Sequence, residues 1–305
     1  MSSPPVAAPL ANRHPVLAPA SLLVAAATWG LVWYPYRLLE LEGLSGSVSS
    51  LLTYALGALP LLFLVKGRAW PGAGDARWLL AVALASGWTN LSYVLAVIHG
   101  EVMRVMLLFY LAPLWTVLFA RLILGERAGG GGLAVIALSL AGAMVMLYRG
   151  QGLPLPANNA EWLGLSSGIG FALTNVLTRK TRDIPIGMRS LWVFLGVTGM
   201  AAVFAAAEPD AMDTIVAVAA PDWLMMAGIA LALLLATFTV QYGLSYVPAN
   251  RAVVILLFEL VVAALSSRWL AGEIMDAREW IGGAMIVAAT LFSIRLNAHD
   301  PKNPG

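Results

Sequence analysis

The sequence contains no cysteine and very few charged or histidine residues for its length. Of 305 residues, 11% are Asp, Glu, Lys or Arg and three are histidine, whereas an average soluble domain has roughly 25% charged residues. The absence of cysteine excludes disulfides, thiolate nucleophiles and cysteine metal sites. No His, Asp and Glu cluster has metal-ligand spacing, and no glycine-rich phosphate loop follows a strand. We therefore expect no metal, no cofactor and no ATP-driven pump.

The remaining composition is that of a membrane protein. The chain is 60% hydrophobic, and its apolar stretches of about 20 residues are long enough to cross a hydrocarbon core about 30 Å thick. These stretches are continuous and do not alternate, which argues against a β-barrel. A net charge of +2 gives no reason to expect nucleic acid. The predicted fold class is an all-α polytopic membrane protein with ten spans, near residues 20–38, 45–65, 77–98, 103–124, 131–148, 161–180, 188–207, 221–245, 249–271 and 279–296.

The two ends of the chain and the distribution of positive charge predict its orientation. Residues 1–19 are rich in proline and alanine, and we expect them and residues 297–305 to be cytoplasmic tails, the first disordered. With the N-terminus inside, 13 Lys and Arg residues lie on the cytoplasmic side and 5 lie outside. This bias predicts that both termini face the cytoplasm of a bacterial-type inner (plasma) membrane.

One stretch of the sequence occurs twice. Residues 104–126, RVMLLFYLAPLWTVLFARLILGE, align without a gap on residues 251–273, RAVVILLFELVVAALSSRWLAGE, with five of 23 positions identical. Two membrane helices could share apolar residues and terminal charges by chance. Charged residues are scarce here, however, so the matching Arg and Gly-Glu positions favour a true repeat, with halves at 20–150 and 151–296. The matching charged and glycine positions are Arg104/Arg251, Arg121/Arg268, Gly125/Gly272 and Glu126/Glu273.

An odd number of spans in each half means that the second half enters the membrane from the opposite side. Inverted repeats are a recurring architecture of secondary transporters, in which the substrate lies near the midplane between the halves. The repeat therefore indicates transport.

These motifs resemble the drug/metabolite transporter superfamily with paired EamA domains. Ala112-Pro113 lies in the middle of span four, Glu259-Leu260 lies in the middle of span nine, and both spans end in Gly-Glu. The sequence is most similar to YddG-type exporters of aromatic and other neutral amino acids. This resemblance implies ten helices around a central cavity lined by spans 1, 3, 4, 6, 8 and 9. Span nine has Leu260 where the family often has proline, so the residue expected to kink it is absent.

Glu259 is the only acid placed near the middle of a span. A charged carboxylate there costs roughly 2.5–3.5 kcal/mol on insertion scales. It must therefore face the cavity, find a partner, or stay protonated. One interpretation is that it binds a substrate ammonium group or a coupling proton. The other is that it is a neutral acid hydrogen-bonded to a neighbouring helix.

Several other polar side chains are candidates to line the cavity. Thr237, Gln241 and Ser245 follow four-residue spacing on span eight and share one helical face. A polar stripe avoids lipid because hydrocarbon offers no hydrogen-bond partners. Such groups also tie helices together, but for the whole set we favour cavity lining. The further members are Asn90, Tyr93, Thr174, Asn175 and Thr178.

Aromatic and terminal charged residues complete the candidates. Trp33, Trp88 and Trp115 lie deep enough to stack on a planar substrate. Tryptophans at span ends fit interfacial belts. Arg104 and Arg251 could attract a carboxylate, but we expect them to snorkel or to bond loop carbonyls. Glu126 and Glu273 are expected to cap helices or to pair locally with Arg127 and Arg278. The belt tryptophans are Trp70, Trp78, Trp162, Trp223 and Trp280.

The sequence therefore predicts a secondary transporter that exports aromatic or other neutral hydrophobic amino acids by alternating access. A superfamily transporter of another small metabolite or drug is the main alternative. Sugar phosphates are disfavoured because no Lys/Arg pair lies at membrane depth. An integral-membrane enzyme would need convergent acid/base or metal groups, and a scaffold would need neither the repeat nor a buried carboxylate. Facilitated diffusion and proton coupling both remain open.

Overall fold

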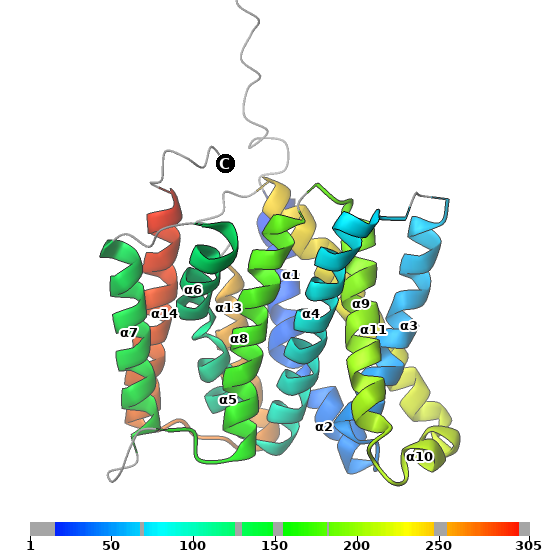
Figure 1. Ribbon diagram of the computed structural model, residues 1–305. Coiled ribbons are helices and arrows are strands. Elements are labelled where there is room, and N and C mark those ends of the chain that lie inside the picture. Colours follow the sequence, from blue (N-terminus) through cyan, green and yellow to red (C-terminus); the bar gives the residue numbers. More distant parts are fainter. Residues whose placement is uncertain are drawn as a thin grey trace, which may run out of the picture.

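The computed structural model is a single helical bundle (Figure 1). It describes residues 16–67, 70–125, 130–148, 155–181, 183–246 and 255–298, and of helical residues 130–132, 241, 244–246, 290 and 293–298 it describes the backbone alone. The elements are α1 (Leu17–Leu31), α2 (Trp33–Leu41), α3 (Gly46–Val65), α4 (Ala73–His99), α5 (Val102–Phe109), α6 (Ala112–Leu124), α7 (Gly130–Leu147), α8 (Asn159–Lys180), α9 (Ile186–Ala205), α10 (Ala211–Ala217), α11 (Ala220–Tyr246), α13 (Phe258–Ser266), the π-helical turn η2 (Ser267–Ala271) and α14 (Ala277–Ala298).

The helices have the length and surface of membrane spans. Within the described part of the chain, six of them, with α1–α2 and α5–α6 each counted as one, are long and apolar enough to cross a bilayer, and Leu133–Leu147 is a shorter apolar helix. Large apolar side chains such as Val203 and Leu224 are exposed, which a soluble monomer rarely tolerates over a wide surface. Helices overlap all ten predicted spans, although residues 249–254 of span nine lie outside the described residues.

Three details differ from the sequence prediction. α1 already begins at Leu17, inside the predicted N-terminal tail, and α14 extends to Ala298. The short helix α10 lies between spans seven and eight, where only a loop was expected. Its seven residues are too few for a periodic pattern to be recognised in the sequence.

The two copies of the repeated stretch share their local structure. The first copy is interrupted at Tyr110 and Leu111, between α5 and α6, and the second forms a turn at Leu257, the position that aligns with Tyr110. Gly125 and Gly272 end the two copies in the left-handed conformation, with φ of 73° and 70°, which glycine adopts without steric cost. Span nine is therefore interrupted although it lacks the proline.

The proline accounts for one interruption and not for the other. Pro113 lies in the first turn of α6 and has no N–H to donate. At the aligned position, the Leu260 amide instead donates to the Leu257 carbonyl at 3.1 Å, which forms a tight turn. Both copies are thus interrupted at the same aligned position, one before a proline and the other at a hydrogen-bonded turn.

The copies run through the bundle in opposite directions. The end of the second copy, at Glu273, contacts the first residues of α5. α7 and α14 are likewise antiparallel neighbours, because Arg278 at the start of α14 bonds the Tyr148 carbonyl just after α7. α1 packs on α11 and α13, α8 packs on α4 and on the α5–α6 pair, and α3 packs on α9 (Figure 1).

Glycines allow the closest of these helix contacts. A Cβ on Gly87 of α4 would lie 2.5 Å from the Gly196 carbonyl oxygen of α9, and a Cβ on Gly196 would collide with the Ala83 backbone. Gly142 of α7 and Gly282 of α14 approach each other in the same way. Close backbone packing is a main source of helix association where lipid is as apolar as the side chains.

We predict that Gly196→Ala destabilises the protein by about 1–3 kcal/mol, because the colliding atoms belong to the backbone of α4 and cannot rotate away. The matched control is Gly199→Ala on the same helix, where an added Cβ meets open space. It should be neutral or stabilising by up to about 1 kcal/mol. Thermal unfolding of the purified protein in detergent measures both variants. Equal melting temperatures for the two would contradict the packing described here.

Candidate functional site

Glu259 and Tyr110 meet where the two interrupted stretches come together. Glu259 lies in the first turn of α13, and its carboxylate accepts a 2.9 Å hydrogen bond from the Tyr110 hydroxyl. Protein surrounds the Glu259 side chain, which nevertheless keeps some accessible surface. A ligand or proton site at this carboxylate stays a prediction.

A chain of aromatic ring contacts begins at Tyr110. Phe109 lies 5.9 Å from Tyr110 and 5.6 Å from Tyr93 of α4, and 4.9 Å from Phe171 of α8, measured between ring centroids. Tyr93 lies within electrostatic range of Glu259. The buried Tyr93 hydroxyl has no hydrogen-bond partner among the described side chains and backbone. The cluster therefore offers a carboxylate, a free hydroxyl and apolar ring faces in one place.

The backbone of the first break explains how these residues are positioned. Because Pro113 cannot donate, the Phe109 carbonyl loses its usual partner four residues on. Gly164 and Gly168 bring α8 against this region, and a Cβ on Gly168 would lie 2.6 Å from the Phe109 carbonyl oxygen. The sequence identified Tyr93 and Glu259, but it missed Phe109, Tyr110 and Phe171. Pro113 was the signal, since the residues just before a proline break are those it re-orients.

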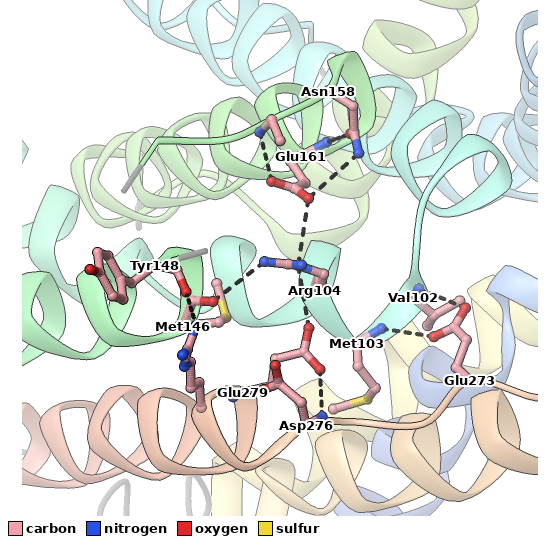
Figure 2. A network of polar contacts seen from close by, with 12 residues as sticks. Val102, Met103, Arg104, Met146, Tyr148, Asn158, Glu161, Glu273, Asp276 and Glu279 are labelled. Atoms are coloured by element: carbon pink, nitrogen blue, oxygen red, sulfur yellow. Dashed lines mark hydrogen bonds and ion pairs between the residues drawn. The ribbon is translucent and has the colours of Figure 1, made fainter. Parts of the chain in front are cut away.

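Charged residues gather at one end of the bundle, where α5 and α14 begin and which we call the Arg104 end. The Arg104 Nε atom lies 3.5 Å from Glu161 of α8 and 3.4 Å from Glu279 of α14 (Figure 2). Its Nη2 donates to the Met146 carbonyl at 3.4 Å. The expectation of a loop carbonyl partner was thus incomplete. The two acidic partners come from segments that no local pattern connects to Arg104.

Glu273 lies at the same end and caps α5. Its carboxylate accepts from the Val102 amide at 2.9 Å and the Met103 amide at 3.3 Å (Figure 2). It also lies 3.6 Å from Arg37. Capping was therefore predicted correctly, but the partner was wrong, because Arg278 bonds Tyr148 instead. The remaining predicted members of this group, Glu126, Arg127 and Arg251, lie outside the described residues.

Known proteins are similar to this chain along nearly its whole length. The sequence profile of the EamA-like transporter family matches the chain twice, over residues 17–148 and 158–295. The chain belongs to the EamA-like transporter family.

Two relatives agree with that membership. A curated protein of Archaeoglobus fulgidus, named "Uncharacterized transporter", is 27% identical over 277 residues, which cover 90% of this chain and 96% of the relative. One solved crystal structure is 17% identical with a TM-score of 0.56, covering 92% of this chain and 99% of the other. At that identity it shows the fold alone. The family and the named relative point to a multi-pass membrane transporter of a small molecule, with no indication of an enzyme.

Two predicted residues of this EamA-like transporter have structural roles in the present arrangement. Trp33 is fully buried, and its Nε1 donates to the Ser266 hydroxyl at 3.1 Å, which ties α2 to α13. Asn90 accepts from the Tyr54 hydroxyl at 2.7 Å and donates to the Ser86 carbonyl at 2.9 Å. The single indole N–H of Trp33 is thus used, whereas the Asn90 amide nitrogen carries a second N–H. Cavity lining stays a prediction for both residues.

The other predicted polar residues lie on α8 and α11. The hydroxyls of Thr174 and Thr237 donate to carbonyls four residues earlier in their own helices, so their side chains do not tie helices together through these bonds. Asn175 is exposed and Thr178 is half-buried. Gln241 and Ser245 belong to α11, but their side chains lie outside what the structure describes. Cavity lining stays a prediction for this set.

The predicted tryptophans divide between contacts and surface. Trp88 is half-buried and its ring lies 6.0 Å from Phe204 of α9, and Trp115 has a buried Nε1 without a described partner. The belt positions are exposed or, for Trp78, stacked near Arg77 and Lys180. The exposed belt tryptophans are Trp70, Trp162, Trp223 and Trp280.

A cavity of about 250 Å³ lies away from Glu259, at the end of the bundle opposite Arg104. It lies between the α3–α4 and α8–α9 connections, and Trp70, Asp75 and Met188 are among its lining residues. None of the aromatic cluster lines it.

We predict that the hydroxyl of Tyr110 and the carboxylate of Glu259 are energetically coupled. Tyr110→Phe should destabilise the protein by about 1–3 kcal/mol in the presence of Glu259. In a Glu259→Ala background the same change should cost much less, because the acceptor is absent. A double-mutant cycle of unfolding in detergent measures the coupling. Additive effects would show that the 2.9 Å contact contributes nothing.

Proposed function

We propose that this protein is a secondary transporter that exports aromatic or other neutral hydrophobic amino acids by alternating access. The observation that carries the proposal is the site at Glu259, where a partly accessible carboxylate accepts from Tyr110, and ring contacts lead from Tyr110 through Phe109 to Tyr93 and Phe171. A carboxylate can bind the ammonium group of an amino acid by a charge-assisted hydrogen bond. Ring faces at 5–6 Å spacing suit an aromatic or large apolar side chain.

The arrangement of helices supports two inverted halves of five spans each. The break at Tyr110 aligns with that at Leu257, and both copies end in a left-handed glycine. The packing is also matched: α1 contacts α11 and α13 as α8 contacts α4 and α6. α3 pairs with its counterpart α9, and α7 pairs with α14. Two antiparallel copies of one unit can expose a shared site to each side in turn.

The proposed orientation follows the distribution of positive charge. The sequence prediction assigns 13 of the 18 Lys and Arg residues to the side of the termini. The positive-inside rule then places the termini in the cytoplasm of a bacterial-type inner membrane and the Arg104 end outside. Export thus moves substrate from the opposite end, past Glu259, to the Arg104 end.

We expect saturable uptake of labelled tryptophan and phenylalanine, but not of a sugar phosphate, into liposomes that contain the purified protein. Glu259→Gln separates two roles of the carboxylate. If Glu259 holds the ammonium group, the variant should raise the KM roughly tenfold or more, because a charged hydrogen bond is lost. If Glu259 carries a coupled proton, the variant should retain flux and lose its dependence on a pH gradient.

Glu42→Gln is the control for this assay, since Glu42 is an exposed carboxylate between α2 and α3, away from the cluster. It should transport as the wild-type protein does. Absence of any amino-acid flux from folded protein would refute the proposed substrate class, and flux of other metabolites would then identify the alternative transporter. Absence of all solute flux would favour an enzyme or a scaffold.

A further inference from the structure

The short helix α5 is held at both of its ends by polar contacts with the other half of the chain. At its start, the Glu273 carboxylate caps the Val102 and Met103 amides. Within the same turn, Arg104 lies between Glu161 and Glu279. At its far end, directly after Phe109, Tyr110 donates to Glu259. One eight-residue helix therefore connects the candidate site to the Arg104 end.

We propose that α5 is the gate of the transporter at the Arg104 end, latched by Arg104 between Glu161 and Glu279 and hinged at Tyr110–Leu111 beside Glu259. This inference rests on alternating access as proposed above. It adds the moving element and the contacts that must break when the site opens to that side.

The latch carboxylates are built to stay in place when Arg104 leaves. One oxygen of Glu161 accepts from the Ala157 amide at 2.9 Å, and the other lies 3.5 Å from both Arg104 and the Asn158 side-chain nitrogen (Figure 2). Glu279 divides its oxygens in the same way between the Asp276 amide, at 2.9 Å, and Arg104. Each acid thus accepts from an amide at the start of its own helix with one oxygen and faces Arg104 with the second. Arg104 is the part that can move.

Charge makes these contacts reversible. The side chains of Arg104, Glu161 and Glu279 are only 14%, 4% and 9% exposed. Bringing such groups out of water costs nearly as much as their pairing returns, so paired and hydrated states lie close in free energy. Water that enters when α5 moves would hydrate them again. Apolar side chains in the same place would favour the closed state more strongly, because exposing them to water returns no hydration energy.

The hinge lies where the backbone is already interrupted. Tyr110 and Leu111 separate two helices, and Pro113 removes one hydrogen bond across the gap. α5 can therefore change its angle to α6 without breaking a regular helix, as hinges at element ends do. A ligand that displaces the Tyr110 hydroxyl from Glu259 acts directly on this hinge.

Further contacts between the two halves lie at the same end. Arg37 pairs with Glu273 and also donates to the Val97 and Gly100 carbonyls, at 2.6 and 2.7 Å through Nη2. The Ser45 hydroxyl donates to Glu208 at 2.6 Å. The structure therefore represents the state in which this end is closed.

Because the chain has no cysteine, a single introduced thiol reports accessibility without background. Phe171→Cys places it on α8, against Phe109 at the hinge end of α5. Its reaction with a membrane-impermeant maleimide is measured from outside in intact cells and from inside in inverted vesicles. The thiol variant is compared with the same variant carrying Glu279→Gln or Arg104→Gln. Glu42→Gln, an exposed carboxylate at the same end, is the control.

Loss of the latch should raise the rate of labelling from outside about tenfold and lower the rate from inside, as expected for a shift of about 1.4 kcal/mol between two states. Glu42→Gln should change neither rate. Glu279→Gln keeps the size of the side chain, so it tests the latch even if Arg104→Gln does not fold. Unchanged rates, or rates that rise on both sides through general loosening, would overturn the gate.

The readout does not depend on the substrate. A reciprocal change in labelling together with absent amino-acid flux would leave the gate standing and refute the proposed substrate class. A reciprocal change with the sides exchanged would leave the gate standing and reverse the proposed orientation.

Discussion

A helix that is interrupted within a bilayer leaves backbone groups without partners, and the rest of this structure depends on how that constraint is met. Hydrocarbon cannot satisfy these groups, so protein must cover the break between α5 and α6. α8 does so through Gly168, which brings its backbone onto Phe109, and through Gly164, which brings it onto Val105 of α5. Covering the break places α8 against α4 and the α5–α6 pair, and with it Phe171 against Phe109.

The need to satisfy backbone groups also applies at helix starts, where three acidic residues both cap a helix and pair with an arginine. Glu161, Glu273 and Glu279 each accept hydrogen bonds from amides at a helix start, where free N–H groups and the helix dipole favour a negative charge. They also lie against Arg104 or Arg37. Few charges therefore suffice both to end helices cleanly and to join the two halves, which accounts for a chain with only 11% charged residues.

The sequence predicted the class of the protein because hydrophobic length is a local property. The helical spans and the glycines that end both copies followed from the composition of short stretches of the chain. The partners of the charged side chains could not be predicted in this way. Glu273 caps a helix 171 residues away, and Arg104 pairs with acids on two other helices. Such pairings depend on the tertiary arrangement alone.

The orientation of Trp33 was another feature that the sequence could not predict. Its position deep in the first span suggested a ring that faces a substrate, whereas the structure buries it completely against Ser266. Depth in the membrane can be read from the sequence, but the direction of a side chain around the helix axis depends on which neighbours pack there.

The separation between Arg104 and its acidic partners also constrains how the protein is made. α5 leaves the ribosome before α8, and well before Glu273 and α14, because synthesis runs from the N-terminus. Until those helices insert, Arg104 must keep its charge near the membrane surface by extending toward water. The first half therefore enters the bilayer with an unsatisfied cation and an uncapped α5. Completion of the last helix pair closes the bundle, so truncated chains would be the ones exposed to quality-control proteases.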